Sequence, residues 1–219
     1  MQDYRIIDVS QWMDDFRFPG NPSFSVEGPF NRVTGSSPEF VYDFTSCTQT
    51  GTHIQGPHYF LKDGRTIETF PLEDFEGDAV LIDIEKRGED TTRSDLESLL
   101  DEADCKLEIL ILRSGNMEEI ISSGSIDPTR RPGLSMDAAK FLAEETNFKM
   151  LAIDSIGFES RITKNFEVNV YLCSKEILLL EGLVNLNSVS QRKVQLQAFP
   201  LKLKGVEGTP CRAIIRETL

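Results

Sequence analysis

The amino-acid sequence predicts a single α/β domain with a mixed, β-rich core. The 219 residues are 39% hydrophobic and 27% charged, a composition typical of one globular domain with a substantial core. Strand candidates outnumber helix candidates and several cluster toward the C-terminus, which favours a mixed sheet over a regular doubly wound one. We find no internal repeat, low-complexity tract or linker between two cores, so residues 1–219 are predicted to form one domain.

Eight short segments are predicted strands because they are rich in β-branched or aromatic residues. In chain order they are Arg5 to Val9, Phe40 to Thr45, Ala79 to Ile84, Leu107 to Arg113, Met150 to Asp154, Glu176 to Leu180, Val194 to Leu203 and Cys211 to Arg216. The prolines and glycines between Phe18 and Pro38 predict a long irregular loop, which is either a functional flap or a plain surface loop.

Helices are predicted where the sequence offers a cap before an apolar face. Ser94, with Glu97 three residues later, has the spacing of a capping box. Ser135 precedes apolar residues at helical spacing, and Asn147 is the predicted stop of that helix. Two further candidates are Val168 to Lys175 and Met117 to Ser122.

Charge and cysteine usage restrict the partners and the compartment. The chain carries 36 acidic and 23 basic residues, and its net charge of −13 repels phosphate backbones and anionic lipids. No nucleic acid or membrane partner is therefore expected. The apolar runs are too short to span a bilayer, the first residues do not resemble a signal peptide, and the four cysteines form no CxxC pair. These features predict a cytoplasmic protein without disulfides.

Both histidines of the chain, His53 and His58, lie within ten residues of each other. The glycines and the proline around them predict a turn-rich loop, rather than a strand interior, that presents the imidazoles to a cleft. The alternative is that both histidines are ordinary polar residues of a surface loop without a catalytic role.

The stretch Gln49-Thr50-Gly51-Thr52-His53-Ile54-Gln55-Gly56-Pro57-His58-Tyr59 resembles the signature H-x-G-T-H-x-D-x-P-x-H of the cyclase, or kynurenine formamidase-like, family of metal-dependent hydrolases. Later blocks resemble that family in the same order, among them Leu110 to Gly115, Pro132 to Ser135, Ala152 to Ser155 and Gly208 to Ala213. The resemblance covers most of the chain. It implies the swivelling β/β/α fold and a homodimer or higher homo-oligomer.

The chain departs from the family pattern at the positions that would hold a metal ion. The family's first motif histidine falls on Gln49, its aspartate on Gln55 and its final, proton-transferring histidine on Tyr59. A later histidine ligand falls on Asn169. Only His53 and Glu181 retain a residue type that the family uses as a ligand.

A catalytic zinc or manganese site needs about three protein ligands, usually imidazoles and carboxylates. Amide side chains are neutral and weak ligands, but they keep a similar size and can donate and accept hydrogen bonds. We therefore predict that the protein binds no metal ion and no other cofactor, and that its pocket keeps the shape expected for the family.

The substitutions support two hypotheses. In the first, the protein is an enzyme of specialised metabolism that acts on a small carbonyl-containing molecule by metal-independent acid–base catalysis. The reaction would be lactone or amide hydrolysis, or a ring-forming or dehydration step. The candidate catalytic residues are His53, His58, Glu181 and Tyr59, and the candidate substrate-binding residues are Gln49, Gln55 and Asn169. The exchange of polar for polar residues favours this hypothesis.

In the second hypothesis the protein is a catalytically silent binding or scaffolding relative, because loss of activity explains each substitution equally well. A third, less favoured interpretation is a metal hydrolase with unusual ligands, namely Glu181, His53, His58 and Cys47 or Cys173. Separately, the early aromatic residues Trp12, Phe16, Phe18, Phe24 and Phe30 could cap a pocket or a subunit interface.

Overall fold

A closed β-sheet forms the centre of the molecule in this computed structural model, which describes residues 3–31, 39–84 and 88–219. The strand order is β1 (Tyr4–Asp8), β12 (Gly208–Thr218), β11 (Lys193–Pro200), β5 (Glu76–Asp83), β7 (Ile109–Arg113), β9 (Met150–Ile153), β10 (Leu178–Glu181) and β4 (His53–Gln55). Because β4 also pairs with β12, the strands from β12 to β4 close into a barrel, and β1 pairs with β12 alongside it.

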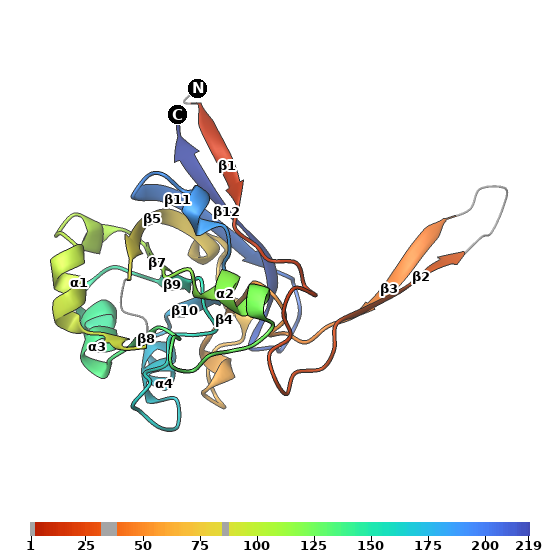
Figure 1. Ribbon diagram of the computed structural model, residues 1–219, viewed down its shortest axis with the longest axis horizontal. Helices are drawn as coiled ribbons and strands as arrows, with labels where there is room; N and C mark the ends of the chain where they lie inside the picture. Colours follow the sequence, from red (N-terminus) through yellow and green to blue (C-terminus); the bar gives the residue numbers. More distant parts are fainter. Residues whose placement is uncertain (1–2, 32–38, 85–87) are drawn as a thin grey trace.

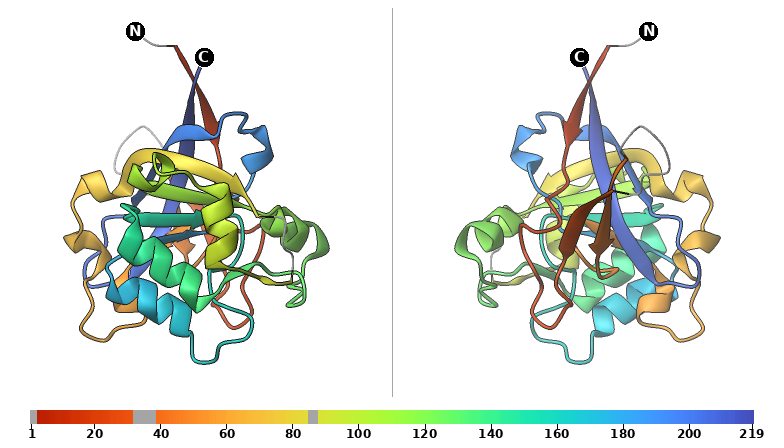
Figure 2. Two further views of the ribbon diagram at one scale, coloured as in Figure 1. Left: turned by 90° about the vertical axis from the view of Figure 1, so that its left-hand side faces the viewer. Right: turned by 90° about the vertical axis from the view of Figure 1, so that its right-hand side faces the viewer.

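Alternation along the strands separates the interior of the barrel from its outer face. On β7, Ile109 and Ile111 belong to the core inside the barrel, whereas Leu110 and Leu112 belong to a second core under the helices. The parallel strands β5, β7, β9 and β10 carry that second core. Helices α1 (Arg93–Leu99), α3 (Met136–Glu145) and α4 (Glu167–Ser174) cover it (Figures 1 and 2).

Apart from a two-stranded hairpin near the N-terminus, one further helix, two very short strands and five 3-10 segments make up the rest of the regular structure in the described residues. Helix α2 (Asn116–Ser123) follows β7, and the two-residue strands β6 (Asp90–Thr91) and β8 (Gly133–Leu134) pair in parallel. The short 3-10 segments are η1 (Pro57–Tyr59), η2 (Ile67–Thr69), η3 (Leu72–Phe75), η4 (Asp104–Lys106) and η5 (Leu186–Ser188). No described helix has the length and apolar character needed to cross a bilayer.

All eight predicted strands are present, with ends that differ by up to a few residues. The predicted helices are also present, and Ser135 caps α3 as expected by accepting a hydrogen bond from the Ala138 N–H. The start predicted for α1 is wrong. Thr92 is its cap, and the capping box forms with Asp95, because the helix begins at Arg93 and each member of the box lies two residues earlier than predicted.

Two predicted loops contain strands. Within Phe18 to Pro38, β2 (Ser25–Asn31) pairs with β3 (Phe40–Thr45), while residues 32–38 lie outside the described part of the chain. The segment around His53 is also not a loop, because residues 53–55 form β4, hydrogen-bonded to strands on both sides. Pairing partners distant in the sequence outweigh the local turn signals of the flanking glycines.

The β2–β3 hairpin projects away from the barrel, on the side opposite the helices (Figure 1). One face of this arm carries Val26, Phe40, Tyr42 and Phe44, whose exposed fractions are 55, 67, 54 and 61%. We call these four side chains the aromatic face of the arm. A two-stranded hairpin with such a face buries little apolar surface within its own chain.

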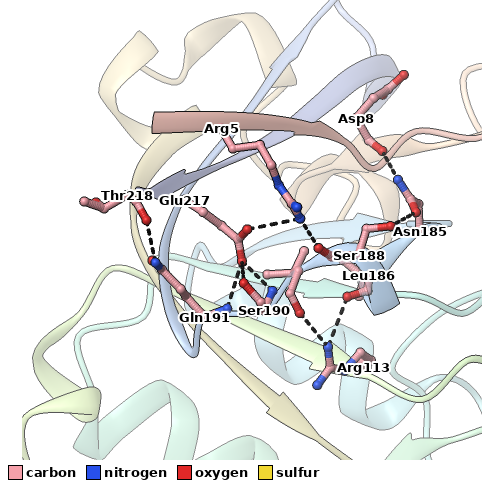
Figure 3. Close-up of polar contacts among 11 residues, drawn as sticks. Arg5, Asp8, Arg113, Asn185, Leu186, Ser188, Ser190, Gln191, Glu217 and Thr218 are labelled. Atoms are coloured by element: carbon pink, nitrogen blue, oxygen red, sulfur yellow. Dashed lines mark hydrogen bonds and ion pairs between the residues drawn. The ribbon is translucent and has the colours of Figure 1, made fainter. Parts of the chain in front are cut away.

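A polar network holds the segment that follows β10 (Figure 3). The buried carboxylate of Glu217 accepts hydrogen bonds from Ser190 and from the Gln191 N–H and forms a 3.2 Å ion pair with Arg5. Arg113 donates to the carbonyl oxygens of Leu186 and Val189 at 3.1 and 3.2 Å. The network holds residues 186–191, in the segment that connects β10 to β11.

Candidate active site

A cavity of about 170 Å³ lies on the outer face of the barrel, where β4 meets β10. Polar side chains line its base and apolar side chains, mostly aromatic, line its walls. The polar lining residues are Gln11, Asn21, Gln49, His53, Gln55, Tyr59, Ser155, Asn169 and Glu181, and the apolar ones are Phe16, Phe18, Phe60, Met117, Ile156 and Phe166. The predicted role of Phe16 and Phe18 as pocket-lining aromatics agrees with their position.

Strand register places the two retained family residues side by side. His53 on β4 is the direct antiparallel partner of Glu181 on β10. Ile54 points into the barrel core, so its neighbours His53 and Gln55 point outward, onto the same face as Glu181. Gly182 then turns the chain with a φ of +74°, and a Cβ there would lie 2.6 Å from the Gln11 amide nitrogen.

His53 presents an unprotonated nitrogen to the cavity. Its Nδ1 lies 2.9 Å from the Gly51 carbonyl oxygen, which only accepts hydrogen bonds, so Nδ1 carries the proton. Its Nε2 lies 3.7 Å from Glu181 Oε2 and has no hydrogen-bond partner among the described residues. Burial lowers the pKa of His53, which favours the neutral imidazole with a free lone pair on Nε2.

Glu181 is a buried carboxyl group with one directed donor. The Gln55 amide donates from Nε2 to Glu181 Oε1 at 2.9 Å. Burial raises the pKa of Glu181 to about 8, and the more distant charge of Arg131 opposes that shift. Near neutral pH the site therefore pairs a basic imidazole nitrogen with a protonated carboxyl group.

Two of the predicted substrate-binding amides reach the base of the cavity. Gln55 belongs to β4, and Asn169 lies in the first turn of α4, where Glu159 accepts a 3.0 Å hydrogen bond from its backbone N–H. The side-chain oxygens Gln55 Oε1 and Asn169 Oδ1 are buried and find no donor in the described structure. Gln11 Oε1 has the same property, although nothing in the sequence pattern singles out Gln11.

The third predicted amide, Gln49, lies at the rim beside a carboxylate that sequence reasoning missed. Gln49 Nε2 donates to Glu207 Oε1 at 3.2 Å, and the Thr48 hydroxyl donates to the same oxygen. Glu207 lies just before β12, 158 residues after Gln49, so only the closure of the barrel brings the two together.

The structure brings Tyr59 to the site but not His58. Tyr59 lines the cavity, is 43% exposed and packs edge-on against Phe60 at 4.6 Å between ring centroids. Burial of the hydroxyl, followed by the charge of Glu181, raises the pKa of Tyr59. His58 precedes it in η1, where its backbone N–H bonds to Arg65, and it is absent from the cavity lining in the described chain.

The residues present do not fit the metal ion that the family name implies. Among the described residues no group of three or more His, Cys, Asp or Glu side chains is placed to hold a metal ion. The Gln55 N–H also occupies Glu181 Oε1, which a cation would need. Cys173 belongs to the buried side of α4, where burial raises the pKa of its thiol to about 12, so it is not a thiolate ligand.

The fold and the site define an α/β barrel protein with a partly polar cavity, and comparison with known proteins gives the family. The family described as "Putative cyclase" matches residues 7–160. Kynurenine formamidase of Bacillus cereus (strain ATCC 14579) is 30% identical over 215 residues, 96% of each chain. Cyclase-like protein 3 of Oryza sativa is 30% identical over 176 residues, 77% of this chain and 62% of that protein. The chain belongs to the cyclase family of kynurenine formamidase-like hydrolases.

Solved structures confirm the predicted fold. Isatin hydrolase A from Ralstonia solanacearum has a TM-score of 0.81 at 19% identity, with 97% of this chain and 92% of that chain covered. A structure described as a predicted metal-dependent hydrolase from Bacillus stearothermophilus has a TM-score of 0.75 at 23% identity, with 98% of both chains covered. The swivelling β/β/α class expected from the motif is therefore correct.

Proposed function

We propose that the protein is a cyclase-family enzyme that cleaves or forms a C–N or C–O bond at the carbonyl group of a small metabolite, by acid–base catalysis without a metal ion. One observation carries this proposal: the free Nε2 of His53 lies 3.7 Å from the carboxyl group of Glu181 in a buried cavity. A base and an acid with opposite burial-induced pKa shifts are the arrangement that proton transfer near neutral pH requires.

In the hydrolytic direction, His53 Nε2 takes a proton from water while the water oxygen bonds to the carbonyl carbon. Glu181 then donates its proton to the leaving nitrogen or oxygen as the bond from that atom to the carbonyl carbon breaks. This leaves an imidazolium and a carboxylate, and transfer of one proton between them restores the starting state. Ring closure uses the same roles with a substrate N–H or O–H in place of water: His53 takes its proton as the nitrogen or oxygen bonds to the carbonyl carbon of a carboxylic acid, and Glu181 donates its proton to the departing hydroxyl group, which leaves as water.

The neighbouring residues support these roles. The Gly51 carbonyl holds the His53 tautomer, and Gln55 holds the Glu181 carboxyl group in place. Tyr59 is available as a hydroxyl donor to the carbonyl oxygen, because its raised pKa keeps the phenol protonated. We include no role for His58, which lies outside the cavity lining of the described chain.

The test is turnover of a panel of small lactones, amides and their ring-opened forms by the purified protein, before and after dialysis against a chelator. The proposal predicts turnover that is unchanged by the chelator and reduced at least about a hundredfold in His53→Ala. His58→Ala is the matched control and should keep wild-type turnover. Turnover that survives His53→Ala, or that the chelator abolishes, contradicts the mechanism.

The silent binding relative remains the competing hypothesis. It predicts that compounds from the panel raise the melting temperature of the protein and that none is converted. Thermal-shift and product measurements on the same samples separate the two hypotheses, because only the enzyme consumes its ligand.

A further inference from the structure

Three buried oxygen atoms in the cavity have no role in the proposed proton transfers. They are the side-chain oxygens of Gln11, Gln55 and Asn169, residues with exposed fractions of 9, 2 and 4%. None of the three accepts a hydrogen bond from the described part of the chain. A buried polar atom without a partner destabilises the folded state, so three in one cavity need an explanation.

The orientation of two of these amides is fixed by their own nitrogen atoms. Gln11 Nε2 donates to the Gly182 carbonyl oxygen at 3.0 Å, and Gln55 Nε2 donates to Glu181 Oε1 at 2.9 Å. The Gly182 carbonyl oxygen only accepts, and Glu181 Oε1 accepts when the carboxyl proton is on Oε2, the oxygen nearer His53 Nε2, so a flipped amide would place two acceptors against each other. The groups that remain for a ligand are therefore the carbonyl oxygens, which accept hydrogen bonds.

We infer that the cavity binds its ligand through an NH2 group, which donates its two hydrogen bonds among the oxygens of Gln11, Gln55 and Asn169, in addition to the carbonyl group that reacts. The inference rests on the proposed function only in taking this ligand to be the substrate. An NH2 group supplies two donors, whereas ester, ether and ketone oxygens supply none and would leave these acceptors unpaired. A ligand carboxylate would supply no donor to these oxygens and would add a charge beside Glu207, which accepts a hydrogen bond from the cavity residue Gln49.

Size and wall composition indicate what carries the NH2 group. A cavity of about 150 Å³ accommodates benzene, so the 170 Å³ here holds about one aromatic ring with a small substituent. Phe16, Phe18 and Phe60 line the walls, and aromatic rings pack well against a flat, apolar partner. The ligand class is thus an aromatic primary amide or aromatic amine of about that size.

Calorimetric titration with benzamide and acetophenone tests the inference, because the two molecules have nearly the same shape and differ by NH2 in place of CH3. We expect benzamide to bind at least ten times more tightly. N,N-Dimethylbenzamide, which keeps the amide carbonyl but has no N–H, should bind no better than acetophenone. Equal affinity for benzamide and acetophenone, or tighter binding of benzoate, overturns the inference.

Asn169→Leu should abolish the preference for benzamide without lowering the melting temperature of the free protein, because it replaces an unpaired buried oxygen with apolar surface. Gln11→Met is a second variant in case Asn169→Leu does not fold. Gln195→Leu, on the exposed face of β11, is the matched control and should retain the preference. A preference retained in both cavity variants contradicts the assignment.

The titration does not depend on turnover. Selective binding of benzamide by a protein that converts nothing supports the inference and contradicts the proposed enzyme. Turnover of compounds without an N–H group, with no selectivity for benzamide, supports the proposed enzyme and contradicts the inference.

Discussion

Glu181 and His53 differ from an ordinary surface ion pair because both are buried and both favour their uncharged forms. The protonation state of Glu181, and with it the proposed activity, depends on pH near 8. The amides around them hold orientations that no sequence pattern specifies. The motif thus predicted that His53, Gln55 and Glu181 lie in one cavity, but it predicted neither Gln11 nor the direction in which each amide points.

The rate of turnover should fall as pH rises through about 8, where Glu181 loses its proton, and fall again below the lowered pKa of His53. Glu181→Gln should reduce kcat roughly a hundredfold or more and remove the alkaline decline. Glu176→Gln, on an exposed carboxylate nearby in sequence, is the control. An alkaline decline that persists in Glu181→Gln would assign that step to another group.

Amide side chains occupy most of the family's ligand positions. We therefore expect elemental analysis of the purified protein to find well under one zinc or manganese ion per chain. Combining Gln49→His, Gln55→Asp and Asn169→His restores the family's residue types and should produce uptake of about one zinc ion. Stoichiometric metal in the wild-type protein would contradict the prediction, and no uptake by the triple variant would show that the cavity has lost more than its ligands.

At the scale of elements, strand pairing between residues distant in the sequence explains which strands were not predicted from local sequence patterns. The long hydrophobic strands β5, β7 and β9 were predictable because their buried runs are continuous. The three-residue β4 was not predictable, because glycines lie close to it and its strand partners are 124 (Gln55 to Leu179) and more residues away. Glu207 was missed for the same reason, since it reaches Gln49 only after β4 and β12 pair.

The network after β10 makes Glu217 important for stability. Glu217→Ala would remove the charged acceptor of the Ser190 and Gln191 N–H groups, and it should lower the free energy of unfolding by about 1–3 kcal/mol. Urea denaturation measures the change, with Glu89→Ala, on a carboxylate outside the network, as the control. An unchanged unfolding midpoint would show that water replaces these contacts at no cost.

The aromatic face of the arm is where the predicted homo-oligomer should form, with a second copy of the chain covering Val26, Phe40, Tyr42 and Phe44. Tyr42→Lys combined with Phe44→Lys should shift the mass measured by light scattering toward the monomer. Thr45→Lys adds charge to the opposite face of the same hairpin and should leave the mass unchanged. A wild-type monomer at micromolar concentration would contradict the prediction.

For the whole molecule, the buried carboxyl of Glu181 sets a trend of stability with pH. Its pKa is raised to about 8 in the folded chain from 4.5, so the folded state keeps a proton that the unfolded state releases between these values. This contribution to stability is present at low pH and is lost as pH rises, by up to about 1.4 kcal/mol per pH unit. Glu181→Gln should flatten the trend, as followed by urea denaturation from pH 5 to 8.

The closure of the barrel has one more consequence. The same three residues, His53 to Gln55, join the two ends of the curved sheet and carry the imidazole that faces Glu181. Local opening of the β4 pairing would separate His53 from Glu181. The closure of the barrel and the proposed proton transfer therefore depend on the same hydrogen bonds. Exchange of the β4 amide protons with deuterium should therefore slow when ligand binds. Substitutions far from the cavity that weaken the β4 pairing should impair turnover before they lower the melting temperature.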